Sequence, residues 1–188
     1  ILPWLLFTRT VSRTSAAASS NRALLVYPHI YPIDFMLGRI FIEAVTSFVV
    51  ISILLGAAFL FEGFVPQNPL MGLCALITLS LMGGGIGMIN ATIISLFTAY
   101  DTFFKPMQRL LYFTSGIFFV VSDFPSGVQD KLSWQPILNC VEWLRTALLP
   151  SYDNSHFYSM TYVTLMALTL FITGMMLERL RRRTHRIP

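Results

Sequence analysis

The sequence predicts an all-α fold, a polytopic bundle of transmembrane helices formed by one domain over residues 1–188. Of these residues 55% are hydrophobic and only 12% are charged, whereas soluble domains carry about 25% charged residues. Long uncharged runs alternate with short polar segments, and the basic residues gather beside the ends of the runs. One globular core cannot hide this apolar surplus, so we expect a bilayer to be the solvent.

The first residues, 1–8, are expected to be the end of a membrane helix. The chain opens with Ile-Leu-Pro-Trp and has no initiator Met. It also lacks the basic start and the small-residue cleavage site of a signal peptide. We interpret this start as the tail of a span whose beginning is missing, so that the sequence is a fragment.

Three later runs are long enough to cross a membrane. Residues 40–61 form the clearest span, because 22 residues broken only by Glu43 rise about 33 Å as a helix. Residues 158–177 have similar length, and the run 70–97 is uncharged and longer than a span needs. Its excess length and its glycines at 83, 84, 85 and 87 permit a tilt, a kink or the close approach of a neighbouring helix.

The distribution of Lys and Arg predicts the topology, because these residues collect on the cytoplasmic side. Eleven of the 13 basic residues precede the first complete span, follow the second or follow the last. We therefore expect residues 19–36 and the tail 178–188 to be cytoplasmic. The acid-rich region 122–157 should lie outside. An odd number of crossings must then follow Lys105, so residues 107–124 are expected to cross although their apolar core is short.

Residues 134–150 are left as a re-entrant or interfacial segment on the outer side. Re-entrant backbone is tolerated at membrane depth only where it is buried in protein or lines a watery cavity. This topology therefore predicts a transport pathway. Polar and aromatic side chains in or beside the expected spans are its candidate lining: Glu43, Asn90, Trp134, Glu142, Trp143 and Arg145.

Each of these candidates also has a structural interpretation. Glu43 is an intramembrane acid, but an i, i+4 pair with Arg39 explains it equally well. Glu142 and Arg145 are spaced i, i+3, and their pair either holds the shape of a re-entrant element or is an ordinary surface pair. The tryptophans suit an interfacial belt or the stacking of sugar rings.

No motif for covalent chemistry is present. The sequence contains neither a phosphate-binding GxxxxGK[ST] loop nor an HExxH pair, and its three histidines are scattered. We therefore expect no catalytic residue, no cofactor and no metal site. The terminal arginines are typical of a cytoplasmic anchor that meets anionic lipid, and no nucleic-acid partner is expected.

Two stretches resemble a known family. Residues 21–34 read Asn-Arg-Ala-Leu-Leu-Val-Tyr-Pro-His-Ile-Tyr-Pro-Ile-Asp, after Pro-Trp-Leu-Leu-Phe-Thr-Arg-Thr-Val-Ser at 3–12. Residues 135–145 read Gln-Pro-Ile-Leu-Asn-Cys-Val-Glu-Trp-Leu-Arg, followed by Tyr152. Both resemble the permease subunits of type-2 ABC transporters that export capsular polysaccharide in Gram-negative bacteria, with Gln135 where the family usually has Asn. The resemblance covers nearly the whole chain and implies that the family's N-terminal amphipathic helix, first span and most of the second are absent.

The resemblance implies a polysaccharide permease of the bacterial inner membrane with its C-terminus in the cytoplasm. Such a permease is a homodimer, is driven by a separate ABC ATPase subunit and moves a polymer that is in some cases lipid-linked. The segment that docks on the ATPase would include Asn21, Arg22, Tyr27, Pro28, His29, Tyr31, Pro32 and Asp34.

Other interpretations remain open. The segment 21–34 is also typical of a Pro-containing linker, and the cargo of a type-2 permease is in other cases O-antigen, teichoic acid, a drug or a lipid. An ion-coupled transporter that uses Glu43 as a relay would be expected to show repeated halves, which are not visible here. A membrane-embedded transferase lacks support from any cluster of acids, histidines or metal-ligand spacing.

Overall fold

The computed structural model describes residues 1–21, 23, 24, 27, 29–97, 99–150, 152 and 157–185, without the side chains of 126 and 182–185. The described part is helical and contains no strand, which confirms the all-α prediction. Its helices are α1 (Leu2–Ser20), α2 (Pro32–Glu62), α3 (Pro69–Leu96), α4 (Tyr100–Thr114), η2 (Val121–Asp123), α5 (Ser126–Leu132), α6 (Pro136–Leu148) and α7 (Met160–His185).

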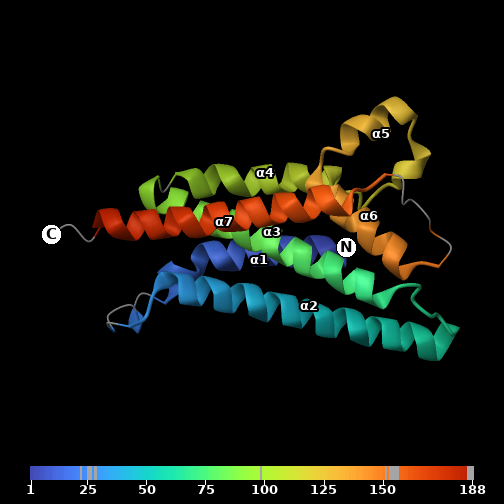
Figure 1. The fold of residues 1–188 in the computed structure, drawn as a ribbon, viewed down its shortest axis with the longest axis horizontal. Helices are drawn as coiled ribbons and strands as arrows, with labels where there is room; N and C mark the ends of the chain where they lie inside the picture. Colours follow the sequence, from blue (N-terminus) through green and yellow to red (C-terminus); the bar gives the residue numbers. More distant parts are fainter. Residues whose placement is uncertain are drawn as a thin grey trace.

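The long helices run along a common axis, and the short ones gather at one end of it (Figure 1). Helices α5 and α6 form that end, together with the connection from α2 to α3. The opposite end holds the segment between α1 and α2, the start of α4 and the end of α7. The basic regions that the charge pattern assigns to one compartment thus share one end of the bundle. Which compartment that end faces stays a prediction.

Helix α3 lies at the centre of the bundle and contacts α1, α2, α6 and α7. Its glycines are the contact points, because an added Cβ would meet a neighbouring helix at each of them. A Cβ at Gly87 would lie 2.9 Å from the carbonyl oxygen of Val11 in α1, and one at Gly85 would lie 2.6 Å from the backbone of Leu170 in α7. Small residues are what close helix contacts in membranes require. The close approach expected from the glycine cluster is therefore what the structure shows.

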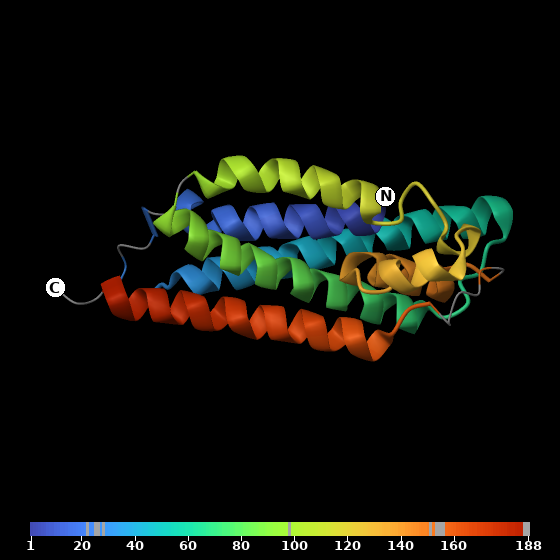
Figure 2. The same ribbon diagram turned by 90° about the horizontal axis from the view of Figure 1, so that it is seen from above.

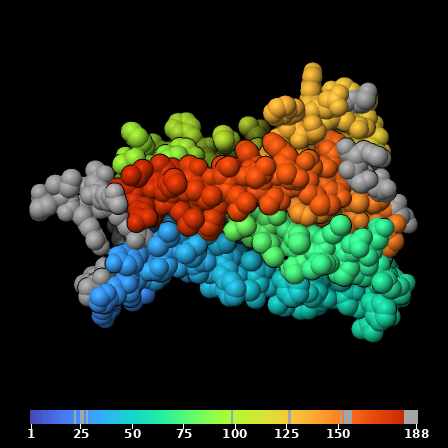
Figure 3. Space-filling model, viewed as in Figure 1, coloured from blue at the N-terminus to red at the C-terminus, as the bar shows by residue number. Residues whose placement is uncertain are grey.

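Three helices are long and apolar enough to cross a bilayer by length and composition: α2, α3 and α7. Helix α3 is mostly buried among the others, whereas α2 turns large apolar side chains outward, such as Phe41 and Phe59. In the space-filling view α2 and α7 cover one face, and α3 is visible between them (Figure 3). An outward apolar surface of this extent is suited to lipid.

Helices reach into the expected coupling region 19–36 from both sides. Helix α1 continues to Ser20, so the expected span end at 1–8 is part of a 19-residue helix. Helix α2 begins at Pro32, eight residues before the predicted span, with Pro at its first position and Asp34 at the third. The Asp34 carboxylate accepts a hydrogen bond from the backbone N–H of Tyr31 at 2.8 Å, which caps the helix there.

The predicted helix at 107–124 is wrong in its bounds, since α4 covers Tyr100–Thr114 and includes Pro106. Gly116 follows with φ of 77°, the left-handed conformation that commonly ends a helix. Helix α7 continues to His185, so most of the predicted tail 178–188 is helical, and its cytoplasmic location stays a prediction. Glu178 is fully buried there and pairs with Arg181 one turn later at 2.8 Å. By contrast, α3 and α6 lie within a few residues of the predicted 70–97 and 134–150.

Replacing Gly85 by Ala tests the central packing. Ala favours a helix more than Gly does, yet its Cβ would collide with the α7 backbone, so we expect a loss of about 1 to 3 kcal/mol of stability. Gly56→Ala in α2 is the matched control, because nothing lies within 4 Å of its added Cβ. Unfolding of both variants in detergent by titration with SDS measures the difference, and equal stability of the two would contradict the packing scheme.

Candidate functional site

Helix α6 carries a buried polar cluster at the end of the bundle opposite the α1–α2 connection. Glu142 is fully buried, and one of its carboxylate oxygens pairs with the Arg145 guanidinium at 2.6 Å. The other oxygen accepts a short hydrogen bond from the hydroxyl of Tyr152. A carboxylate satisfied on both oxygens avoids most of the penalty of burying a charge without partners.

Arg145 extends this cluster to a different part of the chain. Its guanidinium donates to the backbone carbonyls of Gly116 at 2.5 Å and Phe119 at 3.2 Å, in the connection that follows α4. This connection turns at Gly116, where an added Cβ would collide with Leu138 of α6. The i, i+3 pair predicted from the sequence is therefore present, and it holds α6 against the connection rather than lying at an open surface.

Asn139 fixes the start of α6 in the same way. Its side-chain amide donates to the carbonyls of Ser133 at 2.7 Å and Gln135 at 2.8 Å. Its carbonyl oxygen accepts a bond from the backbone N–H of Ser159 at 3.3 Å, just before α7. The sequence contained a signal for this role, since Asn139 is a polar residue on the buried face of a short apolar helix.

A second buried charge lies between α1 and α2. Glu43 is 4% exposed and pairs with Arg13 of α1 at 3.1 Å. The alternative in which Glu43 pairs with Arg39 is wrong: α1 packs against α2 and brings Arg13 to the Glu43 carboxylate instead. Arg13 is two turns before the end of α1 and Glu43 three turns after the start of α2, so this ion pair ties together the two helices that flank the segment 21–31.

The predicted ATPase-coupling residues lie at this end of the bundle or outside the described part. Arg22 and Pro28 fall outside the described residues. Asn21 ends α1, with its side-chain amide on the Ala17 carbonyl at 2.7 Å, and Pro32 and Asp34 begin α2. Tyr27 and His29 are exposed between the helices, Tyr27 by 61%, and Tyr31 is 37% exposed.

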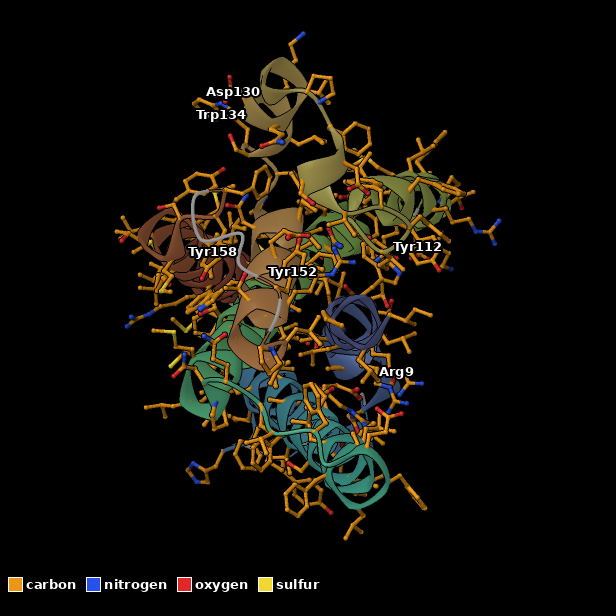
Figure 4. All side chains as sticks on the ribbon, turned by 90° about the vertical axis from the view of Figure 1, so that its right-hand side faces the viewer. Arg9, Tyr112, Asp130, Trp134, Tyr152 and Tyr158 are labelled. Carbon is orange, nitrogen blue, oxygen red and sulfur yellow. The ribbon has the colours of Figure 1, made fainter. Side chains whose placement is uncertain are left out.

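The predicted pathway residues do not form one lining. Asn90 is buried in α3 and its side-chain oxygen accepts a bond from the Tyr100 hydroxyl at 3.0 Å. Trp143 is buried on α6, whereas Trp134 is 76% exposed just before it. The end view shows Trp134 beside α5 and Tyr152 close to α6 (Figure 4). A pathway role for these residues, and for Glu43, Glu142 and Arg145, stays a prediction.

Nothing in the described part resembles a metal centre, since no group of three or more His, Cys, Asp or Glu lies close enough together. Both cysteines are unpaired, Cys74 exposed and Cys140 buried. The two buried ion pairs, Glu142–Arg145 and Glu43–Arg13, hold neighbouring segments together: the first joins α6 to the connection after α4, and the second joins α2 to α1.

No protein-family model matches the chain. Curated proteins do: the polysialic acid transport protein KpsM of Escherichia coli is 27% identical over 182 residues, 96% of this chain and 70% of KpsM. The capsule polysaccharide export inner-membrane protein CtrC of Neisseria meningitidis serogroup B is 23% identical over 92% of this chain and 66% of CtrC. A similar inner-membrane protein, BexB of Haemophilus influenzae, is 24% identical over 71% of this chain and 51% of its own length.

Arg145→Met tests the α6 cluster. It would remove the guanidinium that pairs with the buried Glu142 carboxylate, and we expect a loss of about 3 to 5 kcal/mol of stability, partly restored by adding Glu142→Met. Lys105→Met is the control, because Lys105 also forms an ion pair at 2.6 Å with an acid one turn away but is 68% exposed. Its loss should stay below about 1 kcal/mol.

The same unfolding titration in detergent measures all three variants. Equal losses for Arg145→Met and Lys105→Met would show that the α6 cluster does not hold the end of the bundle together. A double variant less stable than Arg145→Met alone would contradict the interpretation that the cost comes from burying the Glu142 carboxylate without the Arg145 guanidinium.

Proposed function

We propose that this chain, which belongs to the permease family of the type-2 ABC transporters for capsule polysaccharide export, is the membrane-spanning subunit through which a polysaccharide leaves the cytoplasm. The energy comes from ATP hydrolysis on a separate ATPase subunit. The observation that carries this proposal is the similarity to KpsM over 96% of the chain. It includes both the segment 21–31 and the α6 cluster, at opposite ends of the bundle.

The location follows from the same family. The relatives CtrC and BexB are inner-membrane proteins by name, and three helices of this chain suit a bilayer. We place the end with the segment 21–31 and the terminal arginines in the cytoplasm, because Lys and Arg gather on that side. Helices α5 and α6 then lie at the outer side, as a re-entrant segment at the exit, where the exposed Trp134 offers a ring for a departing sugar.

The segment 21–31 is the proposed docking site of the ATPase. It presents Tyr27 at the cytoplasmic end, and aromatic rings are common anchors of protein interfaces. The Arg13–Glu43 ion pair joins the helices on both sides of the segment. A conformational change of the ATPase that displaces the segment would therefore move α1 and α2 together, and so reach the rest of the bundle.

Replacing Tyr27 and Tyr31 by Ala tests the docking site. In the full-length protein we expect the double variant to retain about a tenth or less of the co-purified ATPase, since an aromatic hot spot of an interface costs about 2 kcal/mol or more when truncated. Phe61→Ala is the control, because Phe61 is also aromatic, is 88% exposed and lies near the end of α2 that is remote from this segment.

Undiminished ATPase binding by the double Tyr variant would exclude the segment 21–31 as the docking site.

The ion-coupled alternative predicts a different result in transport assays with vesicles. Transport that continues with a hydrolysis-deficient ATPase and collapses with a protonophore would replace the proposed function by an ion-coupled one.

We further propose that two copies assemble side by side through the flank formed by α1 and α4. Helix α4 buries no residue within this chain, although it carries Asp101, Lys105 and Arg109. Charged side chains at membrane depth are costly in lipid and normally face protein or water. The outward face of α4 also has an apolar stripe at helical spacing, formed by Phe103, Met107, Leu110 and Phe113.

Cysteine cross-linking tests this assembly. In a Cys74→Ser background, which removes the exposed native thiol, Met107→Cys should form a disulfide-linked dimer on mild oxidation of membranes. Phe48→Cys on α2 is the control, since Phe48 is 48% exposed on a face suited to lipid. A cross-link at Phe48 as strong as at Met107, or none at any of the four stripe positions, would exclude α4 as the contact.

A further inference from the structure

A groove lies between α2 and α7, with α3 as its floor. Figure 3 shows this face of the bundle, where α3 is visible between the other two helices. Seen from above, α7 lies on the flank opposite α4, so the groove is not on the flank proposed for the contact between two copies (Figure 2). Two cavities form it, one of about 410 Å³ between the start of α2 and the end of α7, and one of about 420 Å³ between α2 and α3.

The two cavities lie end to end along α2. Ile33 lines the first cavity, and Leu37, one helical turn later, lines the second. On α7, Ile172 lines the first cavity and its neighbour Phe171 the second. One groove therefore runs from the start of α2 to Phe48, near the middle of that helix.

The second cavity is apolar along its whole length. Its lining side chains are aliphatic or aromatic apart from Ser80, whose hydroxyl donates to the Leu76 carbonyl within α3. Its outer edge is open, since Phe41 is 70% exposed. From Leu37 to Phe48 the helix rises about 17 Å, close to half of a hydrocarbon core of about 30 Å. The cavity thus has the length and the lining that an acyl chain of one leaflet requires.

The first cavity carries a cation. Arg179 is the only charged residue among the described residues that line the two cavities. It is exposed and forms no ion pair with any described residue. The acids beside the lining residues in sequence have other partners: Glu178 pairs with Arg181, and Asp34 caps α2 at the backbone of Tyr31. An anion can therefore reach Arg179 without displacing a carboxylate from it.

We propose that this groove binds an anionic phospholipid of the leaflet at this end of the bundle, with the phosphate at Arg179 and one acyl chain in the apolar cavity. The cation favours an anionic headgroup over a zwitterionic one, and the apolar cavity favours a lipid over a soluble phosphate. Met175 and Met176 line the first cavity, and their unbranched, flexible side chains adapt to an irregular ligand. The proposal goes beyond transport, because it needs only the bilayer around the helices.

The test uses the full-length protein in nanodiscs of phosphatidylcholine. A fluorophore on Thr173→Cys, in a Cys74→Ser background, reports the lipid beside the groove, because Thr173 is exposed on α7 next to Ile172. Brominated phosphatidylglycerol, which is anionic, or brominated phosphatidylcholine with the same chains replaces a rising share of the lipid and quenches the fluorophore. We expect half-quenching at an about fivefold smaller share of the anionic lipid, which is what one basic residue near a membrane surface contributes.

Arg179→Gln should abolish this preference, whereas Arg179→Lys should keep most of it. Arg39→Gln is the matched control, because Arg39 lies near the same end of α2, lines neither cavity and forms no ion pair with any described residue. Its preference should stay within about twofold of the original protein. No preference in the original protein, an undiminished one in Arg179→Gln, or an equal loss in Arg39→Gln would overturn the proposal.

Ala44→Phe tests the part of the groove that holds the acyl chain. Ala44 lines the apolar cavity, so the larger ring should fill it and lower the preference for the anionic lipid. Ala57→Phe is the control, because Ala57 is on the same helix but lines neither cavity. An undiminished preference in Ala44→Phe would show that Arg179 attracts headgroups without a groove site, and would overturn the proposal.

Two further outcomes identify other occupants. Loss of the preference on addition of soluble glycerol phosphate would show a phosphate site rather than a lipid site. A disulfide-linked dimer through Phe48→Cys would show that a second copy fills the groove, since Phe48 lines it. Either result would overturn the proposal. Neither measurement depends on transport, so the proposed function is tested separately.

Discussion

The close approach of α3 to its neighbours is the constraint on which the rest of the structure depends. Lipid chains are as apolar as the helices, so the bundle is held by packing and by polar contacts rather than by exclusion of water. Bare backbone at Gly83, Gly85 and Gly87 lets α3 touch α1 and α7 at main-chain distance, and Gly84 admits Ile40 of α2. Near the start of α3, the side chains of Leu144 and Leu148 in α6 pack against Gly72. Helix α3 therefore contacts the elements at both ends of the bundle, α6 at one end and α1 and α2 at the other.

Buried charges then fix the elements that packing alone leaves loose. Glu142 and Arg145 join α6 to the connection after α4, and Glu43 joins α2 to Arg13 of α1. Removing one member of such a pair is costly, although the pair itself adds little net stability. These contacts therefore define geometry: one fixes α6 on the connection after α4, and the other joins the two helices beside the proposed docking segment.

The sequence predicted the fold class, the positions of α3 and α6 and the Glu142–Arg145 pair, because length, apolar runs and i, i+3 spacing are local signals. It missed the start of α4, because Asp101, Lys105 and Pro106 are typical of a loop, whereas the helix begins at Tyr100 and includes all three. It missed Arg13 as the partner of Glu43, because the contact joins two helices.

The most direct measurement is an electron cryomicroscopy structure of the full-length protein with its ATPase in a lipid nanodisc. A transport subunit driven through its cytoplasmic end should show two copies whose α1–α4 flanks face each other across a water-filled passage, with the ATPase seated on residues 21–31. A structure in which α4 faces lipid, or in which the ATPase contacts the end formed by α5 and α6, would contradict this account.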